Sequence, residues 1–439
     1  MAGDDLHRLS AGAAARLIAA GSLTAEALVG ACLTRIAERE GDVGAWAHLY
    51  PEQALDEARA RDREPLRGPL HGVPIGVKDI MDTADRPTGY GSRAYAGHRP
   101  MGDAACVALA RAAGAVVLGK TVTTEFAMMA PGKTRNPHDP TRTPGGSSSG
   151  SAAAVADFMV PLAFGTQTAG SILRPASYCG VVGYKPSWGL VAIAGTKPLA
   201  LSLDTVGGLA RSVGDVALLI GAITGRPELV PGRTPATEPA VAPRIGVFRP
   251  VPFDQAEPAT ITALDHAAAA FARAGAVVAE RAAFPEFDRL VAAQEAILGY
   301  ESAANLAWER TARAALLAPA TLRLLEAGTR VSAAQYDAAL QEVAAARART
   351  AAFFGAFDAM LVPAAPGEAP DAASTGDPIF NRAWTALHLP CITIPAGRGP
   401  AGLPVGVQLV GRAREDWRLL AVAQFAEEAL RAASLGGNA

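Results

Sequence analysis

Two short serine-bearing turns and one upstream lysine are the residues that could do chemistry in this chain of 439 residues. The first turn reads PGGSSSGS over Pro144–Ser151, and the second reads GTQTAGSILRP over Gly165–Pro175. Glycines in both turns let backbone N–H groups converge on a ligand beside a serine hydroxyl. A nucleophile with a nearby place for an oxyanion is what acyl transfer requires. The base for such a reaction can be Lys78, which follows the apolar run Val73–Val77.

Taken together, the three stretches resemble the amidase signature family of serine amidohydrolases, whose catalytic unit is Ser–cis-Ser–Lys. The resemblance implies that Lys78 is the catalytic base, Ser147 the bridging cis-serine and Ser171 the nucleophile. It implies an oxyanion hole formed by the backbone N–H groups of Thr168, Ala169, Gly170 and Ser171. The resemblance continues to GLPVGVQL at Gly402–Leu409, and only about residues 225–355 lack a motif that can be placed.

The second serine turn departs from the family pattern, which reads Gly-Thr-Asp-x-Gly-Gly-Ser-Ile-Arg-x-Pro. Gln167 stands in place of the aspartate, Ala169 replaces a glycine, and the arginine is displaced by one position to Arg174. Members that resemble bacterial malonamidase share the glutamine and the displaced arginine, and there the arginine holds the free carboxylate of the substrate. We therefore expect Arg174 to bind a substrate carboxylate or carbonyl, because a guanidinium fork suits a carboxylate. The alternative for Arg174 is a buried structural salt bridge.

A lysine that acts as a base near pH 7 must have its pKa lowered by roughly three units from about 10.4, which burial can achieve. The resemblance implies hydrolysis of a small carboxamide to a carboxylate and ammonia, with no metal and no organic cofactor. Two alternatives stay open. One is an A-type subunit of a glutamine-dependent aminoacyl-tRNA amidotransferase, which needs a partner chain. The other is a catalytically silent binding protein with the amidase fold.

A second serine-hydrolase pattern is present but fits less well. Ser148 satisfies the motif G-x-S-x-G, which places its serine directly after a strand. Asp139–Thr143 precede it here and contain a proline, so they predict a loop. The motif therefore gives weaker support to Ser148 than the amidase pattern gives to Ser147 and Ser171.

Composition and charge restrict the class of protein. Half of the residues are apolar, a fifth are charged and the formal net charge is −2, which favours a globular protein and gives no support to nucleic-acid binding. The seven histidines and four cysteines are scattered without metal-ligand spacing. The N-terminus lacks a basic signal-peptide segment and no apolar run has membrane-spanning length, so we expect a cytoplasmic protein that does not bind membranes. The expected partner is a small-molecule amide, and a homodimer stays open.

The order of the predicted elements indicates one α/β domain over residues 1–439. As the resemblance implies, we expect a large mixed and mostly parallel sheet between layers of helices. Residues 1–65 should supply N-terminal helices, 66–224 the catalytic core, 225–357 a variable helical region that shapes the substrate pocket, and 358–439 the closing strands and helix.

Local signals predict individual elements within this domain. Helices are expected at 24–39, with Thr24 as N-cap, and at 151–157, with Ser149 or Ser151 as N-cap. An almost entirely helical stretch is expected at 286–356. Strands are expected at 69–80, 116–118, 178–185, 188–194, 244–248, 358–363, 389–396 and 404–410.

Overall fold

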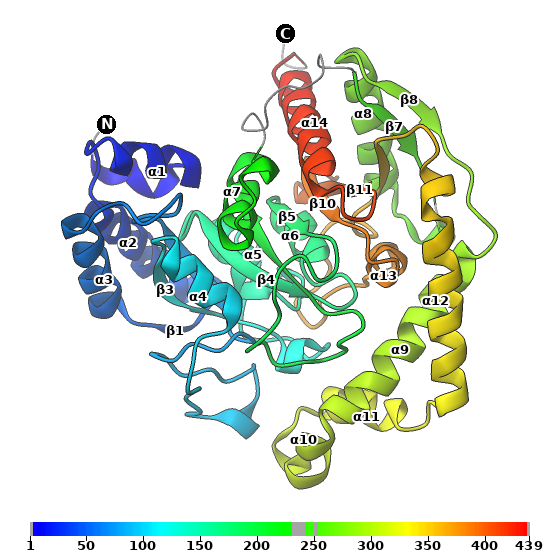
Figure 1. The fold of residues 1–439 in the computed structure, drawn as a ribbon, viewed down its shortest axis with the longest axis horizontal. Coiled ribbons are helices and arrows are strands. Elements are labelled where there is room, and N and C mark those ends of the chain that lie inside the picture. Colours follow the sequence, from blue (N-terminus) through cyan, green and yellow to red (C-terminus); the bar gives the residue numbers. More distant parts are fainter. Residues whose placement is uncertain (1–2, 231–241, 250–252, 437–439) are drawn as a thin grey trace.

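An eleven-stranded sheet runs through the described part of the chain, with the order β1-β3-β2-β4-β6-β5-β10-β11-β9-β7-β8 (Figure 1). The computed structural model describes residues 3–230, 242–249 and 253–436. Residues 225–243, whose composition of Pro, Glu and Thr predicts a linker or surface loop, lie mostly outside these residues. The strands are β1 Trp46–Leu49, β2 Pro74–Lys78, β3 Val116–Thr121, β4 Leu162–Gln167, β5 Val182–Lys185, β6 Thr205–Ala210, β7 Arg244–Val247, β8 Val277–Glu280, β9 Ala359–Pro363, β10 Cys391–Arg398 and β11 Pro404–Gly411.

The α/β class and the mixed sheet flanked by helices are confirmed, but the expectation that the sheet is mostly parallel is wrong. Six of the ten neighbouring strand pairs are antiparallel. One reason is local, since β10 and β11 are joined by a short turn at residues 399–403 and a short turn can only connect antiparallel strands. The parallel pairs β2–β3 and β2–β4 lie where the lysine is found.

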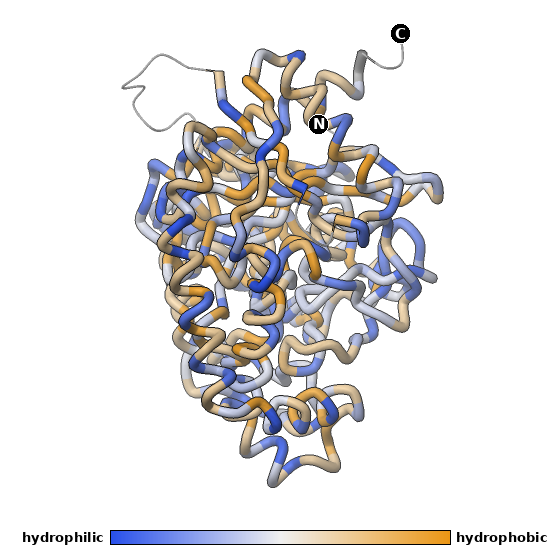
Figure 2. Tube along the Cα trace, turned by 90° about the vertical axis from the view of Figure 1, so that its right-hand side faces the viewer, coloured by the Kyte–Doolittle hydropathy of each residue, from blue (hydrophilic) through white to orange (hydrophobic). Residues whose placement is uncertain are grey.

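Helices cover the sheet on both faces. Along β3, Val117 packs into one hydrophobic cluster, whereas Val116 and Leu118 pack into another, because alternate side chains of a strand point to opposite faces. Figure 2 shows hydrophobic stretches through the middle of the molecule and hydrophilic stretches on many outer turns. The α-helices are α1 Ala11–Ala19, α2 Ala25–Val43, α3 Pro51–Arg63, α4 Ala105–Ala112, α5 Ser149–Ala156, α6 Leu173–Cys179, α7 Val213–Thr224, α8 Pro258–Arg273, α9 Leu290–Asn305, α10 Ala307–Ala312, α11 Pro319–Gly328, α12 Ala333–Phe354, α13 Ile379–Ala386 and α14 Asp416–Gly436.

Most of the local predictions are confirmed. Thr24 caps α2, and its hydroxyl accepts a hydrogen bond of 3.1 Å from the N–H of Ala27. The alanine-rich stretch at 286–356 forms helices α9 to α12. In Figure 1 these four helices lie on the opposite side of the molecule from α1–α3. No helix among the described residues is both long enough and apolar enough to cross a bilayer.

Two local predictions are wrong, and one strand is missed. Trp188–Ala194 form turns and no strand; their apolar character comes from packing, since Val191 joins the core and Trp188 stacks on His388. Strand β8 is absent from the predicted elements, because this short edge strand is largely exposed and lacks a clear apolar alternation. The N-cap of α5 is Ser148, whose side chain makes no cap hydrogen bond. The hydroxyls of the two predicted caps, Ser149 and Ser151, donate instead to carbonyl oxygens of a neighbouring loop and strand.

Candidate active site

Lys78 is the last residue of β2, and the parallel pairing of β2 with β4 brings it to the catalytic loops. Ile75 lies opposite Leu162 in this pair, so the carboxyl ends of both strands reach the same edge of the sheet. The Nζ atom of Lys78 consequently lies 2.7 Å from Oγ1 and 3.5 Å from the carbonyl oxygen of Thr166, near the end of β4. The lysine side chain is fully buried.

Ser147 lies in the loop before α5 and faces this amine. Its Oγ atom is 2.8 Å from Lys78 Nζ, and the Gly146–Ser147 peptide bond is cis. The next residue links the two serine turns, since the N–H of Ser148 donates to the carbonyl oxygen of Ser171 at 3.3 Å. The structure therefore brings Lys78, Ser147 and the turn that contains Ser171 together at one place.

The surroundings of Lys78 disfavour its charged form. Burial lowers the pKa of Lys78 well below its ordinary value, and the nearby carboxylate of Asp204 opposes this effect only in part. No ion pair forms between them; instead, Asp204 accepts hydrogen bonds from the hydroxyl of Thr168 and from the N–H groups of Leu199 and Ala200. Burial also raises the pKa of Asp204 to about 6. Dry surroundings thus favour an uncharged amine at Lys78.

Ser171 lies in the turn between β4 and α6, and its side chain opens into a cavity. Its hydroxyl makes no hydrogen bond to any described residue, which leaves it free for a ligand. No hydrogen bond within the described chain uses the N–H groups of the four residues Thr168, Ala169, Gly170 and Ser171. Four successive donors beside a free hydroxyl are an arrangement that can receive an anionic oxygen.

The carbonyl groups of the same segment are held in place by hydrogen bonds. Gln294 Nε2 donates to the carbonyl oxygen of Thr168 at 3.0 Å, and Thr385 Oγ1 donates to that of Ala169 at 2.7 Å. The backbone N–H of Arg174 donates to the carbonyl oxygen of Gly170 at 3.0 Å. Because a carbonyl and the following N–H share one peptide plane, these bonds fix the direction of the free N–H groups.

Gln167 performs a local role in the same turn. Its Oε1 atom accepts hydrogen bonds of 3.0 Å from the N–H of Ile172 and 3.2 Å from that of Leu173, so it caps the start of α6. Its amide nitrogen donates to Thr385 Oγ1 at 2.9 Å. The residue that replaces the family's aspartate therefore orders the turn through neutral hydrogen bonds.

Arg174 is a fully buried cation that also lines the cavity at Ser171. Its Nη2 atom donates to the carbonyl oxygen of Gly146 at 2.8 Å and to Thr375 Oγ1 at 3.4 Å. Its Nε and Nη1 atoms have no hydrogen-bond partner within the described chain. Burial lowers the pKa of Arg174 to about 10, so the group stays charged at neutral pH. The salt-bridge alternative is wrong, since Arg174 pairs with no described carboxylate.

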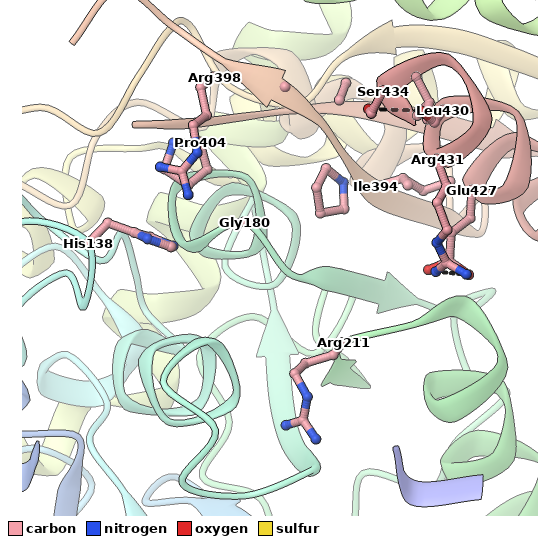
Figure 3. A pocket seen from close by; sticks show the side chains of 13 residues that line it. His138, Gly180, Arg211, Ile394, Arg398, Pro404, Glu427, Leu430, Arg431 and Ser434 are labelled. Atoms are coloured by element: carbon pink, nitrogen blue, oxygen red, sulfur yellow. Dashed lines mark hydrogen bonds and ion pairs between the residues drawn. The ribbon is translucent and has the colours of Figure 1, made fainter. Parts of the chain in front are cut away.

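The cavity at Ser171 has a volume of about 280 Å³. Its polar lining consists of Ser171, Arg174 and Arg382 with Thr168, Glu295 and Ser302, and Glu295 pairs with Arg382 at 3.6 Å. Much of the remainder is apolar and comes from α9, α11 and residues 127–129. A separate cavity of about 340 Å³ is lined by parts of β10 and α14 (Figure 3). That second cavity contains arginines and His138 but none of the three predicted catalytic residues, so the candidate chemistry belongs to the first.

Four residues at the site are not found by sequence reasoning. Gln294, Arg382 and Thr385 lie on α9 and α13, where no motif marks them, and Arg382 Nη1 donates to Gln294 Oε1 at 2.8 Å. Asp204 has one usable signal, since it is an acidic residue in an otherwise apolar stretch that enters β6. The described residues contain no group of three or more His, Cys, Asp or Glu side chains that could hold a metal ion.

Comparison with known proteins agrees with this geometry. The family model described as Amidase matches residues 27–420. The A subunit of glutamyl-tRNA(Gln) amidotransferase from Chloroflexus aggregans is 36% identical, with 95% of this chain and 96% of that protein covered. The protein of the same name from Salinispora arenicola is also 36% identical, with 97% and 98% covered.

Solved structures show the same architecture. A crystal structure of an amidase superimposes with a TM-score of 0.87 at 30% identity and covers 96% of this chain and 99% of that one. The peptide amidase from Stenotrophomonas maltophilia superimposes with a TM-score of 0.80 at 32% identity, with 96% and 97% covered. None of these relatives is named a malonamidase, so that finer assignment rests on Gln167 and Arg174 alone.

Proposed function

The chain belongs to the amidase family, and we propose that it hydrolyses the C–N bond of a small carboxamide to a carboxylate and ammonia. Ser171 is the nucleophile, Ser147 the bridge and Lys78 the base. The observation that carries this proposal is the distance of 2.8 Å between Lys78 Nζ and Ser147 Oγ in a fully buried setting. A buried lysine next to a hydroxyl, with a second free hydroxyl nearby, is an arrangement that activates a nucleophile.

The hydrogen bonds of Lys78 fit a neutral amine. A neutral amine has two N–H donors and one lone pair, and Thr166 offers two acceptor oxygens to those donors. The lone pair then remains for the hydroxyl proton of Ser147. Burial supports this state because it disfavours the ammonium form.

The reaction follows from these positions. Ser171 Oγ attacks the amide carbonyl carbon while its proton passes to Ser147, whose own proton passes to Lys78. The proton returns through Ser147 to the leaving nitrogen, the C–N bond breaks, and ammonia leaves an ester on Ser171. Water then attacks this acyl-enzyme by the same relay and releases the carboxylate.

The oxyanion of each tetrahedral intermediate binds the free N–H groups between Thr168 and Ser171. The carbonyl hydrogen bonds from Gln294 and Thr385 support this role, because donors that are already oriented need no rearrangement during the reaction. Asp204 holds the side chain of Thr168 in the same segment. These three side chains are positioning residues that do not touch the substrate.

Arg174 binds a carboxylate or carbonyl of the substrate, as in malonamidase-like enzymes. Two of its buried nitrogen atoms lack partners, and an unpaired buried donor is unfavourable unless a ligand satisfies it. The group lines the same cavity as Ser171, so it can hold one end of a short amide while the other end reacts. Monoamides of small dicarboxylic acids, such as malonamate, therefore fit the polar part of the cavity.

An ammonia-release assay across short amides, with and without a second carboxylate, tests the proposal. Activity should fall by at least about a thousandfold in Ser171→Ala and by about 100- to 10,000-fold in Ser147→Ala. A fluorophosphonate probe should label Ser171, as peptide mass spectrometry can verify. Labelling of Ser148 instead, or full activity in Ser147→Ala, would overturn the assignment. Absence of both labelling and ammonia would favour a catalytically silent binding protein.

A second candidate function is that of an A-type amidotransferase subunit, which the 36% identity to two such subunits favours. In that case the protein would release ammonia from glutamine and depend on a partner chain. Ammonia release from malonamate by the purified chain, with negligible release from glutamine, would exclude it. Glutaminase activity that appears only with a co-purified partner would support it.

A further inference from the structure

The cavity at Ser171 is larger and more apolar than a short diacid amide requires. Its polar lining consists of Ser171, Arg174 and Arg382 together with Thr168, Ser302 and Glu295, whose carboxylate pairs with Arg382 at 3.6 Å. The larger apolar side chains of the lining, Met128, Met129, Leu298, Leu324 and Val331, form an apolar wall. Malonamate has a single methylene between its carbonyl carbons, so it can occupy the polar end but has no apolar group that could contact this wall. A wall of this kind is unfavourable in water unless an apolar group covers it.

We propose that the apolar wall binds an apolar substituent of the substrate, about the size of an isobutyl or benzyl group. This inference rests on the proposed function and narrows it. The substrate is then an amphipathic monoamide, with its amide at Ser171, a carboxylate at Arg174 and an aliphatic or aromatic group against α9 and α11.

The position of the wall is fixed by a close helix crossing. A Cβ atom on Gly328 of α11 would lie 2.2 Å from the carbonyl oxygen of Gly299 on α9, so the two backbones touch at this point. Both glycines line the cavity. Because backbone contact leaves no side chain to rearrange, the helices cannot move closer and close the space beside Leu298 and Val331. The cavity is therefore a preformed site.

The rim of the cavity is apolar as well. Met129 and Leu324 both line it and are 38% and 40% exposed, and only nine large apolar side chains of the described residues are exposed to this degree. Exposed apolar side chains that gather at one opening are typical of a ligand-binding site. The apolar surface thus continues from the entrance to the wall.

The test compares malonamate with 2-isobutylmalonamate and 2-benzylmalonamate in the ammonia-release assay. Burying such a group against the wall should raise kcat/KM by about tenfold to a hundredfold over malonamate. Ala327→Leu adds a side chain to the lining of the cavity. In this variant the ratio of kcat/KM for the benzyl substrate to that for malonamate should fall at least tenfold. Ala338→Leu, at an exposed position of α12, is the matched control and should keep the wild-type ratio.

Direct binding separates failure of this inference from failure of the proposed function. The diacid 2-benzylmalonate should bind at least about tenfold more tightly than malonate by calorimetry, and Ala327→Leu should remove the difference. This measurement needs no catalysis, so it decides the inference even if no amide is hydrolysed. Equal affinity for both diacids, or equal kcat/KM for all three amides, would overturn the apolar site.

Discussion

Gln294 Nε2 donates to the carbonyl oxygen of Thr168 at 3.0 Å, so helix α9 holds the peptide plane that presents the N–H of Ala169. Gln294→Met should therefore lower kcat by about tenfold to a hundredfold. This decrease is smaller than the decrease of about 100- to 1,000-fold that follows loss of a direct oxyanion donor. The KM for malonamate should change less than about threefold, because Gln294 does not line the cavity. Steady-state kinetics on the folded variant measures this split. A raised KM with an unchanged kcat would show that Gln294 only shapes the pocket.

The buried amine of Lys78 should reduce stability at neutral pH. Its pKa is lowered in the folded state, so between that lowered pKa and 10.5 the unfolded chain binds a proton that the folded chain does not. The contribution of this group to the free energy of unfolding therefore rises with pH across that window. Lys78→Met should unfold at a higher denaturant concentration than the wild type at pH 7, and the difference should shrink towards pH 10. Chemical denaturation at both pH values checks this; a difference independent of pH would contradict a neutral Lys78.

Arg174 should distinguish acidic from neutral amides. Arg174→Gln should raise the KM for malonamate by about tenfold to a hundredfold, in keeping with loss of one charged hydrogen-bonded contact. The KM for propionamide should change less than about threefold. The control is Arg347→Gln, since the partly buried guanidinium of Arg347 also donates to a carbonyl, that of Ala386, but lies outside the cavity. Equal effects on both amides in Arg174→Gln would end the anion-site assignment.

Replacement of two helical glycines by alanine should change the stability of the protein in opposite directions. A Cβ atom on Gly150, in the first turn of α5 after the catalytic loop, would lie 2.2 Å from the carbonyl oxygen of Ala45 and 2.3 Å from the nitrogen of Val122. Gly150→Ala should destabilise the protein by about 1–3 kcal/mol or more. Gly30 in α2 has open space around it, so Gly30→Ala should stabilise by about 0.5–1 kcal/mol. Thermal or chemical unfolding measures both, and a neutral Gly150→Ala would contradict the tight packing of α5.

The catalytic residues can be assigned from sequence because the segments around Lys78, Ser147 and Ser171 resemble the motifs of the amidase signature family, even though Lys78 and Ser147 lie 69 residues apart. Contacts made by residues without a motif cannot be predicted in this way. Gln294 lies 126 residues from Thr168 in an alanine-rich helix, and no pattern in such a helix marks the residue that points inward.

The errors in the predicted fold have a related cause. The apolar run Trp188–Ala194 predicts a strand, although its side chains pack from turns against the core. Strand β8 is hard to detect because an exposed edge strand carries a weak apolar pattern. The prediction of a mostly parallel sheet is wrong for a similar reason. Local sequence indicates that a strand forms but not which strand it will pair with.

Helix α9 carries Gln294 and, one turn later, Leu298 and Gly299. The residue that orients the oxyanion segment and one residue of the apolar wall, Leu298, are therefore fixed to the same helix and move together. In the course of evolution a lineage could not widen this cavity by displacing the helix without also withdrawing Gln294 from Thr168. New preferences should instead arise by exchange of single side chains on a helix that stays where it is, and divergence among descendants of this enzyme should follow that route.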